Sequence, residues 1–319
     1  MKRKIIISGI VVACLGLALF VEGCRHGART RNGDNAKSGE TSGADAINAS
    51  EPQATLSFTA TDEDGVDLAE KEEIRRKYQT KDGATDEIRS VEVRGINGGV
   101  KIETADTDTA EVLVVRSAKK REDLQQYHQI EIVLHDNTLV IRVENDRKSI
   151  FSAIGSRPEG RQRVVLKLPR KIDLELRGTN GKVAIGEIQG QLRMNGINGE
   201  IKATRIAGET EIHGLNGGLD VSFAPLSGNG IEIGGVNGNI DLRFEGEVNA
   251  DVNTWGINGQ VNADLPDVQN KNNEEPGSGR FKARIGTGGT QIRINGINGN
   301  VNLMKAEKAK STTAKVASK

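Results

Sequence analysis

Two aspartates occupy equivalent places in neighbouring repeats of this sequence. Asp220 and Asp241 each lie four residues after the Asn of a Gly-x-Asn-Gly tetrapeptide. If those repeats stack as strands about 4.8 Å apart, the two carboxylates could hold a cation or act as an acid pair. The same column contains Lys202, Asn262 and Asn302, a mixture typical of a solvated face. The sequence therefore predicts no catalytic residue here, and a carbohydrate-active enzyme, a polysaccharide lyase or hydrolase, is the alternative.

The histidines do not form a recognisable ligand set. Of His26, His128, His135 and His213, only the second and third are close in sequence, and they flank a predicted strand. The chain contains no Gly-x-Ser-x-Gly sequence and no Walker sequence. We therefore predict no metal, no cofactor and no enzymatic activity.

Trp255 is the one tryptophan of the chain. It stands just before a Gly-x-Asn-Gly corner, in a solvent-facing column that holds Asn or His in other copies. An exposed ring could contact a partner or a sugar. A single ring is not a carbohydrate platform, so we expect Trp255 to pack against a loop.

The N-terminus has the layout of an export signal. Basic residues at 2–4 precede an apolar run of 17 residues, from Ile5 to Val21. Such a run can also nearly span a bilayer, so an uncleaved signal anchor is the alternative to cleavage. We expect a signal peptide over residues 1–23 and an exported chain held at a membrane of the cell envelope, periplasmic or on the outer surface.

Cys24 follows the apolar run directly. Gly23 before Cys24 resembles the lipobox of bacterial lipoproteins, although Glu22 departs from that pattern. The resemblance implies that Cys24 is the lipid-attachment residue. Cys14 is the other cysteine, and the apolar run before it is too short for this role. With no further cysteine, the exported part must be stable without a disulfide framework.

Composition limits the remaining possibilities. Lys plus Arg equals Asp plus Glu at 44 each, so the chain lacks the basic excess that nucleic-acid binders usually show, and we expect no nucleic-acid partner. Residues 24–84 are polar and predict a flexible linker, although 67–80 could form a short helix or an edge strand. Residues 305–319 predict a disordered Lys-rich tail. The whole chain has 39 glycines and only 3% aromatic residues. This composition favours a part, between the linker and the tail, with many corners between short strands.

Seven Gly-x-Asn-Gly tetrapeptides mark those corners. Aliphatic residues recur three and five places after each Asn, and mostly four and six places before it, with polar or small residues between them. This alternation predicts a strand on each side of the corner with one buried face. The asparagines are Asn97, Asn180, Asn198, Asn216, Asn237, Asn258 and Asn298.

The spacing of the corners indicates stacked coils rather than isolated hairpins. From Asn180 to Asn258 they advance by 18, 18, 21 and 21 residues, the sign of a solenoid. We predict an all-β domain over residues 85–304, a parallel β-solenoid of coils of about 20 residues. Each coil should stack on the one before it, and the asparagines should bridge in a ladder. Residues 88–176 predict longer strands that form an N-terminal β capping block. An antiparallel meander is the alternative.

The order of these segments resembles the bacterial putative-adhesin family of unknown function. "RGINGGVKIE", "LPRKIDLELRGTNGKVAIGEIQG" and "NGINGEIKATRIAGETEIHGLNGGLDV" carry the resemblance, which covers roughly residues 90–304. It implies a β-solenoid and an exported, envelope-associated, non-enzymatic protein. We therefore expect an adhesion, binding or scaffolding module, with envelope-stress sensing as a variant. The partner is an unknown envelope protein or glycan.

Overall fold

The computed structural model describes residues 70–79, 88–126, 130–143, 160–270 and 280–306. The predicted signal peptide, Cys24 and the tail beyond residue 306 lie outside the described residues. The described part is all-β apart from one short helix, α1 (Arg121–Gln126). Within it, no helix has the length and apolar character needed to cross a membrane.

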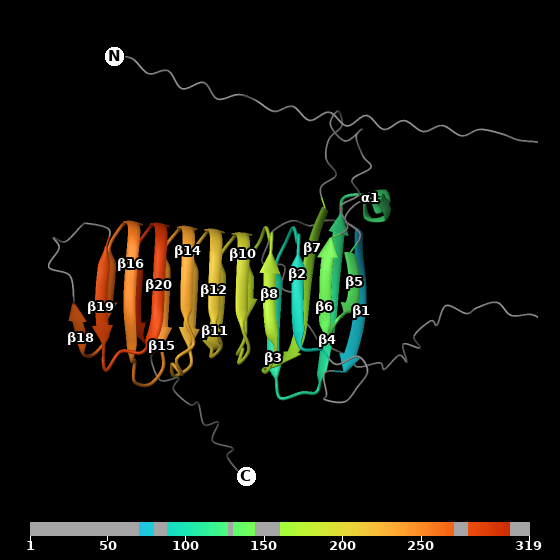
Figure 1. The fold of residues 1–319 in the computed structure, drawn as a ribbon. Helices are drawn as coiled ribbons and strands as arrows, with labels where there is room; N and C mark the ends of the chain where they lie inside the picture. The colour runs from blue at the N-terminus through green and yellow to red at the C-terminus, as the bar shows by residue number, and fades with distance from the viewer. Residues whose placement is uncertain (1–69, 80–87, 127–129, 144–159, 271–279, 307–319) are drawn as a thin grey trace, which may run out of the picture. The chain divides into compact units, whose positions relative to one another are not determined.

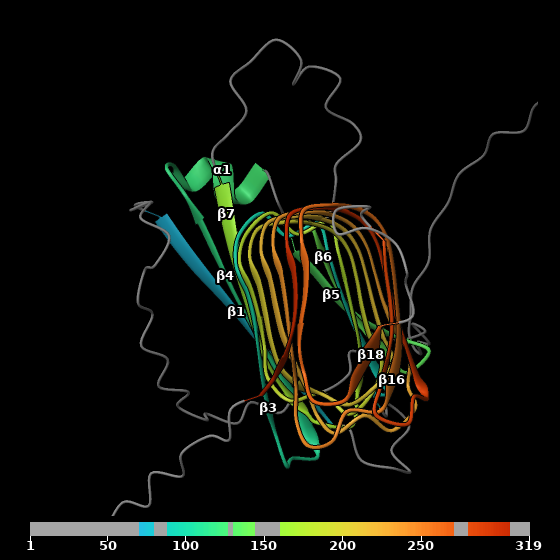
Figure 2. The ribbon, with the colours of Figure 1, turned by 90° about the vertical axis from the view of Figure 1, so that its left-hand side faces the viewer.

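Two large sheets face each other across a common core (Figures 1 and 2). Sheet A has ten strands, in the order β1 (Glu70–Gln79), β4 (Thr109–Ala118), β7 (Gly160–Pro169), β3 (Val100–Ala105), β9 (Val183–Ile185), β11 (Ile201–Ile206), β13 (Leu219–Phe223), β15 (Ile240–Phe244), β21 (Val301–Lys305) and β17 (Val261–Asp264). Sheet B has eleven, in the order β18 (Val268–Asn270), β19 (Phe281–Ile285), β16 (Ala250–Asn258), β20 (Thr290–Asn298), β14 (Ile231–Asn237), β12 (Thr210–Asn216), β10 (Leu192–Asn198), β8 (Asp173–Arg177), β2 (Ser90–Arg94), β6 (Thr138–Val143) and β5 (Ile130–His135). Each Gly-x-Asn-Gly corner joins a strand of sheet B to a strand of sheet A.

Successive copies pair in parallel and in register, as the columns of the sequence predict. Ile201 pairs with Leu219, and Leu219 pairs with Ile240. In sheet B, Met194 pairs with Ile212 in the same way. Because a shift of one residue would turn every aliphatic side chain toward solvent, the buried columns fix this register.

The seventh copy is inserted between the fifth and the sixth. Strand β20 lies between β14 and β16, and β21 lies between β15 and β17 (Figure 1). The expectation that each coil covers the preceding one is therefore wrong for the last two copies. Strand β19 explains the change, because it pairs antiparallel with β16 and occupies its outer edge. The chain can then add its final copy only along the inner edge of β16.

Antiparallel strands occupy the other end of both sheets, where the capping block was predicted. In sheet A, β4 pairs antiparallel with β1 and β7. In sheet B, β5 and β6 form a hairpin whose turn residues Asp136 and Asn137 have φ of 47° and 64°, as a two-residue hairpin turn requires. Of the two alternatives for residues 67–80, an edge strand is observed, since β1 covers residues 70–79.

The core is one continuous aliphatic cluster between the sheets. Ile201, Leu242 and Leu303 have no exposed surface. Phe223 and Phe244 stack within it, with ring centroids 5.4 Å apart. Each buried aliphatic side chain stabilises the fold by roughly 1.5–3 kcal/mol, and the cluster runs through all seven copies.

The corners depend on both glycines. Gly196 has φ of 67°, the left-handed region that side chains disfavour. Gly199 lies against the preceding corner, because a Cβ there would be 2.2 Å from the Gly181 carbonyl oxygen. None of the corner asparagines has a positive φ among the described non-glycine residues. The left-handed conformation of the corner therefore falls on the glycines, and the Asn is free for another role.

That role is a continuous ladder of side-chain amides, as predicted. Asn198 Nδ2 donates to Asn180 Oδ1 at 2.9 Å, and Asn216 Nδ2 donates to Asn198 Oδ1 at 3.0 Å. The first amide, of Asn97, donates to the Gly160 carbonyl of β7 at 3.0 Å. We call this row the corner ladder; in spatial order it contains Asn97, Asn180, Asn198, Asn216, Asn237, Asn298 and Asn258.

Candidate functional site

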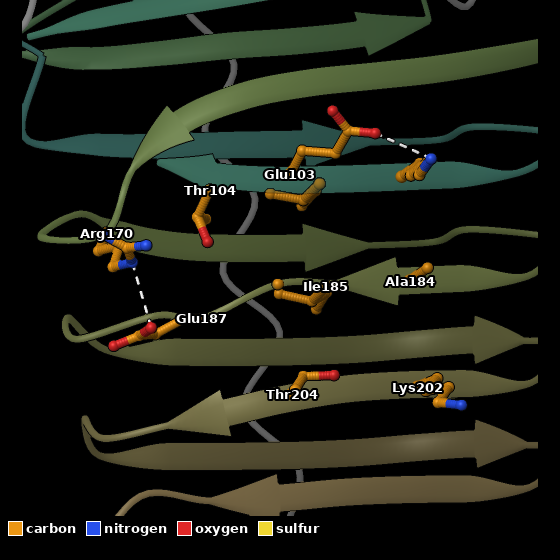
Figure 3. Close-up of a pocket in the computed structure, with 11 residues that line it drawn as sticks. Glu103, Thr104, Arg170, Ala184, Ile185, Glu187, Lys202 and Thr204 are labelled. Carbon is orange, nitrogen blue, oxygen red and sulfur yellow. Dashed lines mark ion pairs between the residues drawn. The ribbon is translucent and has the colours of Figure 1, made fainter. Parts of the chain in front are cut away.

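The outer face of sheet A has a hollow over β3, β9 and β11, with a volume of about 420 Å³ (Figure 3). Its cause lies in β9, which places Ala184 between Lys101 and Lys202. Gly186 follows at the end of the same strand, close to the Thr104 hydroxyl. Ala184 and Gly186 are smaller than their neighbours on the adjacent strands, which leaves the floor of the hollow open. We call this the sheet A hollow.

Charged and hydroxyl side chains surround the hollow. Lys101 Nζ lies 2.8 Å from Glu103 Oε1. Arg170 Nε lies 3.1 Å from Glu187 Oε2, an ion-pair distance without hydrogen-bond geometry (Figure 3). Lys202 is exposed and forms no ion pair or hydrogen bond with its side chain to any described residue.

Arg170 also pairs with Asp106 outside the hollow. The hydrogen bond from Arg170, together with its positive charge, lowers the pKa of the Asp106 carboxyl below the ordinary value of 3.8. The same hydrogen bond raises the pKa of Arg170. Arg170 is therefore held by two carboxylates, and it fixes one wall of the hollow rather than reaching into it.

The hollow is suited to an anionic or hydroxyl-bearing group. Both carboxylates that line it, Glu103 and Glu187, have cationic partners. Lys202 can donate to a ligand without first breaking an ion pair, and Thr104 and Thr204 add hydroxyls at the rim. This arrangement can bind and orient a group.

The aspartate pair has a structural explanation. Asp220 and Asp241 are paired in register on β13 and β15, as predicted. Arg243 forms an ion pair with Asp220 and lies 3.8 Å from an oxygen of Asp241. Asn302 Nδ2 donates to Asp241 Oδ1 at 2.7 Å. Both carboxylates thus have partners within the sheet, in agreement with the mixed face expected for this column.

The structure separates the remaining candidate residues. His135 lies on the β5–β6 hairpin and His213 on β12. His26, His128 and Cys24 lie outside the described residues. Within the described ranges, no group of three or more His, Cys, Asp or Glu side chains is placed to hold a metal ion. Trp255 is 41% exposed on the outer face of sheet B, so the expectation that it packs against a loop is wrong.

Sequence analysis did not identify the residues of the sheet A hollow. Lys101, Ala184 and Lys202 occupy the aspartate column, which was expected to be a mixed solvated face. The available signal was the size of Ala184, a short side chain between two long ones. Arg170 and Glu187 lie in irregular turns outside the repeat columns, so nothing in the alignment of the copies pointed to them.

Comparison with known proteins gives distant likenesses. No family model matches the chain, and no curated protein matches it. A putative cell adhesion protein from Clostridium sporogenes is 16% identical, covering 74% of this chain and 100% of that chain, with a TM-score of 0.43. A putative adhesin from Bacteroides fragilis is 11% identical, covering 73% and 97%, with a TM-score of 0.36.

A further solved structure carries a different description. A putative lipid binding protein from Parabacteroides distasonis is 14% identical, covering 74% of this chain and 97% of that chain, with a TM-score of 0.28. The two adhesin names agree with the resemblance noted in the sequence. At such low values these likenesses support no conclusion about function, which must rest on the surfaces of this chain.

Proposed function

We propose that this protein is an exported, membrane-tethered, non-enzymatic β-solenoid that binds a component of the cell envelope as an adhesion or scaffolding module. The observation that carries the proposal is the sheet A hollow. There, Lys202 is held on an in-register strand beside two hydroxyls and has no ion-pair partner among the described residues.

Rigidity supports a binding role for this surface. Outer-face side chains stand on strands whose inner faces are buried and whose neighbours are paired on both sides. Binding of a ligand then costs little free energy for ordering the protein side chains. The in-register pairing of the copies and the two strands per repeat favour the solenoid description.

The membrane tether rests on the apolar run and on Cys24. A single-chain lipid anchor alone gives marginal membrane binding, and the diacylated cysteine of a lipoprotein would give stable anchoring. To test the tether, cells that express the full chain or Cys24→Ala are fractionated. We expect the wild-type chain in the membrane fraction and the variant released in soluble, exported form. Equal membrane retention of both would contradict lipid attachment and favour the signal anchor.

The binding role is tested with the full chain on surfaces coated with envelope extract. Lys202→Glu should weaken binding about tenfold, since a charge-assisted hydrogen bond contributes about 1.5–3 kcal/mol. Lys182→Glu is the matched control, because Lys182 is an exposed lysine that does not line the hollow. Failure of the wild-type chain to bind, or equal weakening by both substitutions, would contradict a specific role for the hollow.

A further inference from the structure

The outer face of sheet B has a row of side chains distinct from the sheet A hollow. Consecutive residues of the row pair in register from strand to strand, from β10 through β12, β14 and β20 to β16. The insertion of β20 puts Asn295 between Gly234 and Trp255. We call this the outer row; it contains Asn195, His213, Gly234, Asn295 and Trp255.

The polar groups of the outer row are not committed to one another. The side chains of His213, Asn295 and Trp255 form no hydrogen bond or ion pair with any other described residue. Their neighbours behave differently, because the corner amides of Asn237 and Asn298 on two of the same strands are bonded at 2.9 Å. An amide, an imidazole and an indole N–H thus remain available on a rigid sheet.

Gly234 brings two of these groups together. A Cβ at this position would lie 3.0 Å from both Asn295 Oδ1 and His213 Nδ1. The two side chains therefore lean over the glycine from opposite sides, and Gly234 is buried beneath them. They form a converging donor and acceptor pair, with Trp255 on the strand next to Asn295.

We propose that the outer row binds a pyranose-containing glycan. Trp255 offers an exposed ring face for the C–H face of one sugar, and Asn295 and His213 offer hydrogen bonds to hydroxyls further along. The distance from Trp255 to His213 is three strand spacings, about 14 Å, so the site accepts a short oligosaccharide rather than one sugar. This inference rests on the proposed function in taking the chain to be a binding module, and it assigns a second surface and a ligand class.

Other ligand classes fit the row less well. An apolar protein surface would need a contiguous hydrophobic patch, but the large hydrophobic side chains that are exposed in the described part are Trp255 and Val133. Val133 belongs to β5, at the opposite end of sheet B. A nucleic acid would need cationic side chains along the row, and the row has none. Sugars combine an apolar ring face with many hydroxyls, which matches one ring beside uncommitted polar groups.

The single tryptophan makes the proposal directly testable. The full chain is titrated with neutral oligosaccharides of glucose, xylose and N-acetylglucosamine while Trp255 fluorescence is recorded. We expect at least one series to shift the emission saturably. Trp255→Ala, followed by calorimetry, should weaken that binding at least tenfold, and Asn295→Ala should weaken it several-fold.

Gly234→Ala separates binding from folding. The added Cβ meets only the ends of two side chains, which can move, and leaves the strand backbone in place. We expect unchanged thermal stability and glycan binding reduced several-fold. The matched control is Lys182→Glu, at an exposed lysine that belongs neither to the outer row nor to the sheet A hollow, and it should leave glycan binding unchanged. The recovered sugar is analysed by mass spectrometry, and we expect it intact.

The outcomes distinguish the two proposals. If no oligosaccharide shifts the emission and Trp255→Ala binds envelope extract as the wild-type chain does, the glycan site is wrong and the binding role stands. If the chain binds neither sugars nor extract, both proposals are wrong. Cleavage of the sugar would contradict the non-enzymatic role, and unchanged glycan affinity in Trp255→Ala would contradict the site.

Discussion

The corner ladder and the outer row belong to the same stacked strands but use their polar side chains in opposite ways. In the corner ladder each amide is bonded to the next copy, as when Asn237 donates to Asn216 at 3.1 Å. In the outer row, Asn295 and His213 face each other across Gly234 and form no hydrogen bond with a described residue. Stacking a repeat thus produces two kinds of column. The identical residues of the corner ladder saturate one another and add stability, whereas the unlike residues of the outer row leave polar groups free to bind.

The largest effect is expected in a buried column of sheet A. Ile201→Asp places a charge where no side-chain surface is exposed, which should destabilise the fold by at least about 4 kcal/mol. Hydrogen exchange should then show loss of protection in β9 and β13 as well as β11. Lys202→Asp, one residue away on the outer face, should leave protection intact. Loss confined to β11 would contradict a core shared between copies.

Two glycine substitutions should differ sharply. Gly199→Ala would push a Cβ to 2.2 Å from the backbone oxygen of Gly181 at φ of 159°. We expect it to lower the free energy of unfolding by about 2–3 kcal/mol, measured by urea denaturation. Gly234→Ala is the control and should stay within about 0.5 kcal/mol of the wild-type chain. Equal losses of unfolding free energy in the two variants would contradict the closer backbone packing assigned to the corner.

Asparagine substitutions give a smaller difference. Asn216 donates to Asn198 and accepts from Asn237, so Asn216→Ala should cost about 1–2 kcal/mol of unfolding free energy. Asn295→Ala removes no bond to a described residue and should be neutral within about 0.5 kcal/mol. Thermal melting of the two variants side by side measures this. A neutral Asn216→Ala would show that the ladder adds no stability.

The smallest effect on stability is expected from the ion pair between Arg170 and Asp106, beside the sheet A hollow. Arg170 lowers the pKa of the Asp106 carboxyl below 3.8. The pair therefore stabilises the fold at pH values above 3.8, and this stabilisation is lost as the pH falls through the lowered pKa. Arg170→Gln should raise the Asp106 pKa toward its ordinary value, as a carbon-13 NMR titration of the carboxyl would show. Lys182→Gln is the control. An unchanged pKa in Arg170→Gln would contradict the pairing.

Local features of the fold could be predicted from the sequence, because each copy repeats the same local requirements. The alternating aliphatic columns gave the strands and their buried faces, and the repeated Asn gave the ladder. The order of the copies could not be predicted in this way. The corners at Asn258 and Asn298 have the same sequence, Gly-Ile-Asn-Gly, so nothing local distinguishes their places. The interval of 40 residues between them was the available signal, and it contains β19, which occupies the outer edge of β16.

Both candidate surfaces depend on side chains that differ from the repeat. Ala184 and Gly234 are smaller than the other residues next to them in their columns. An alignment of the copies shows what a column has in common and therefore does not reveal single exceptions. The sheet neighbour of Trp255 also depends on the spatial order of the copies, which differs from their order in the sequence. Its partner in the sheet is Asn295, which is 40 residues away, rather than a residue of the preceding copy.

Disulfide trapping tests the order of the copies most directly. In a chain with Cys14 and Cys24 changed to Ser, the pair Asn237→Cys and Asn298→Cys places two thiols on adjacent strands about 4.8 Å apart. The pair Asn237→Cys and Asn258→Cys is separated by two spacings, which exceeds the reach of a disulfide. Mild oxidation should therefore cross-link the first pair and leave the second reduced. Cross-linking of the second pair in place of the first would contradict the inserted copy, and with it the outer row that the insertion completes.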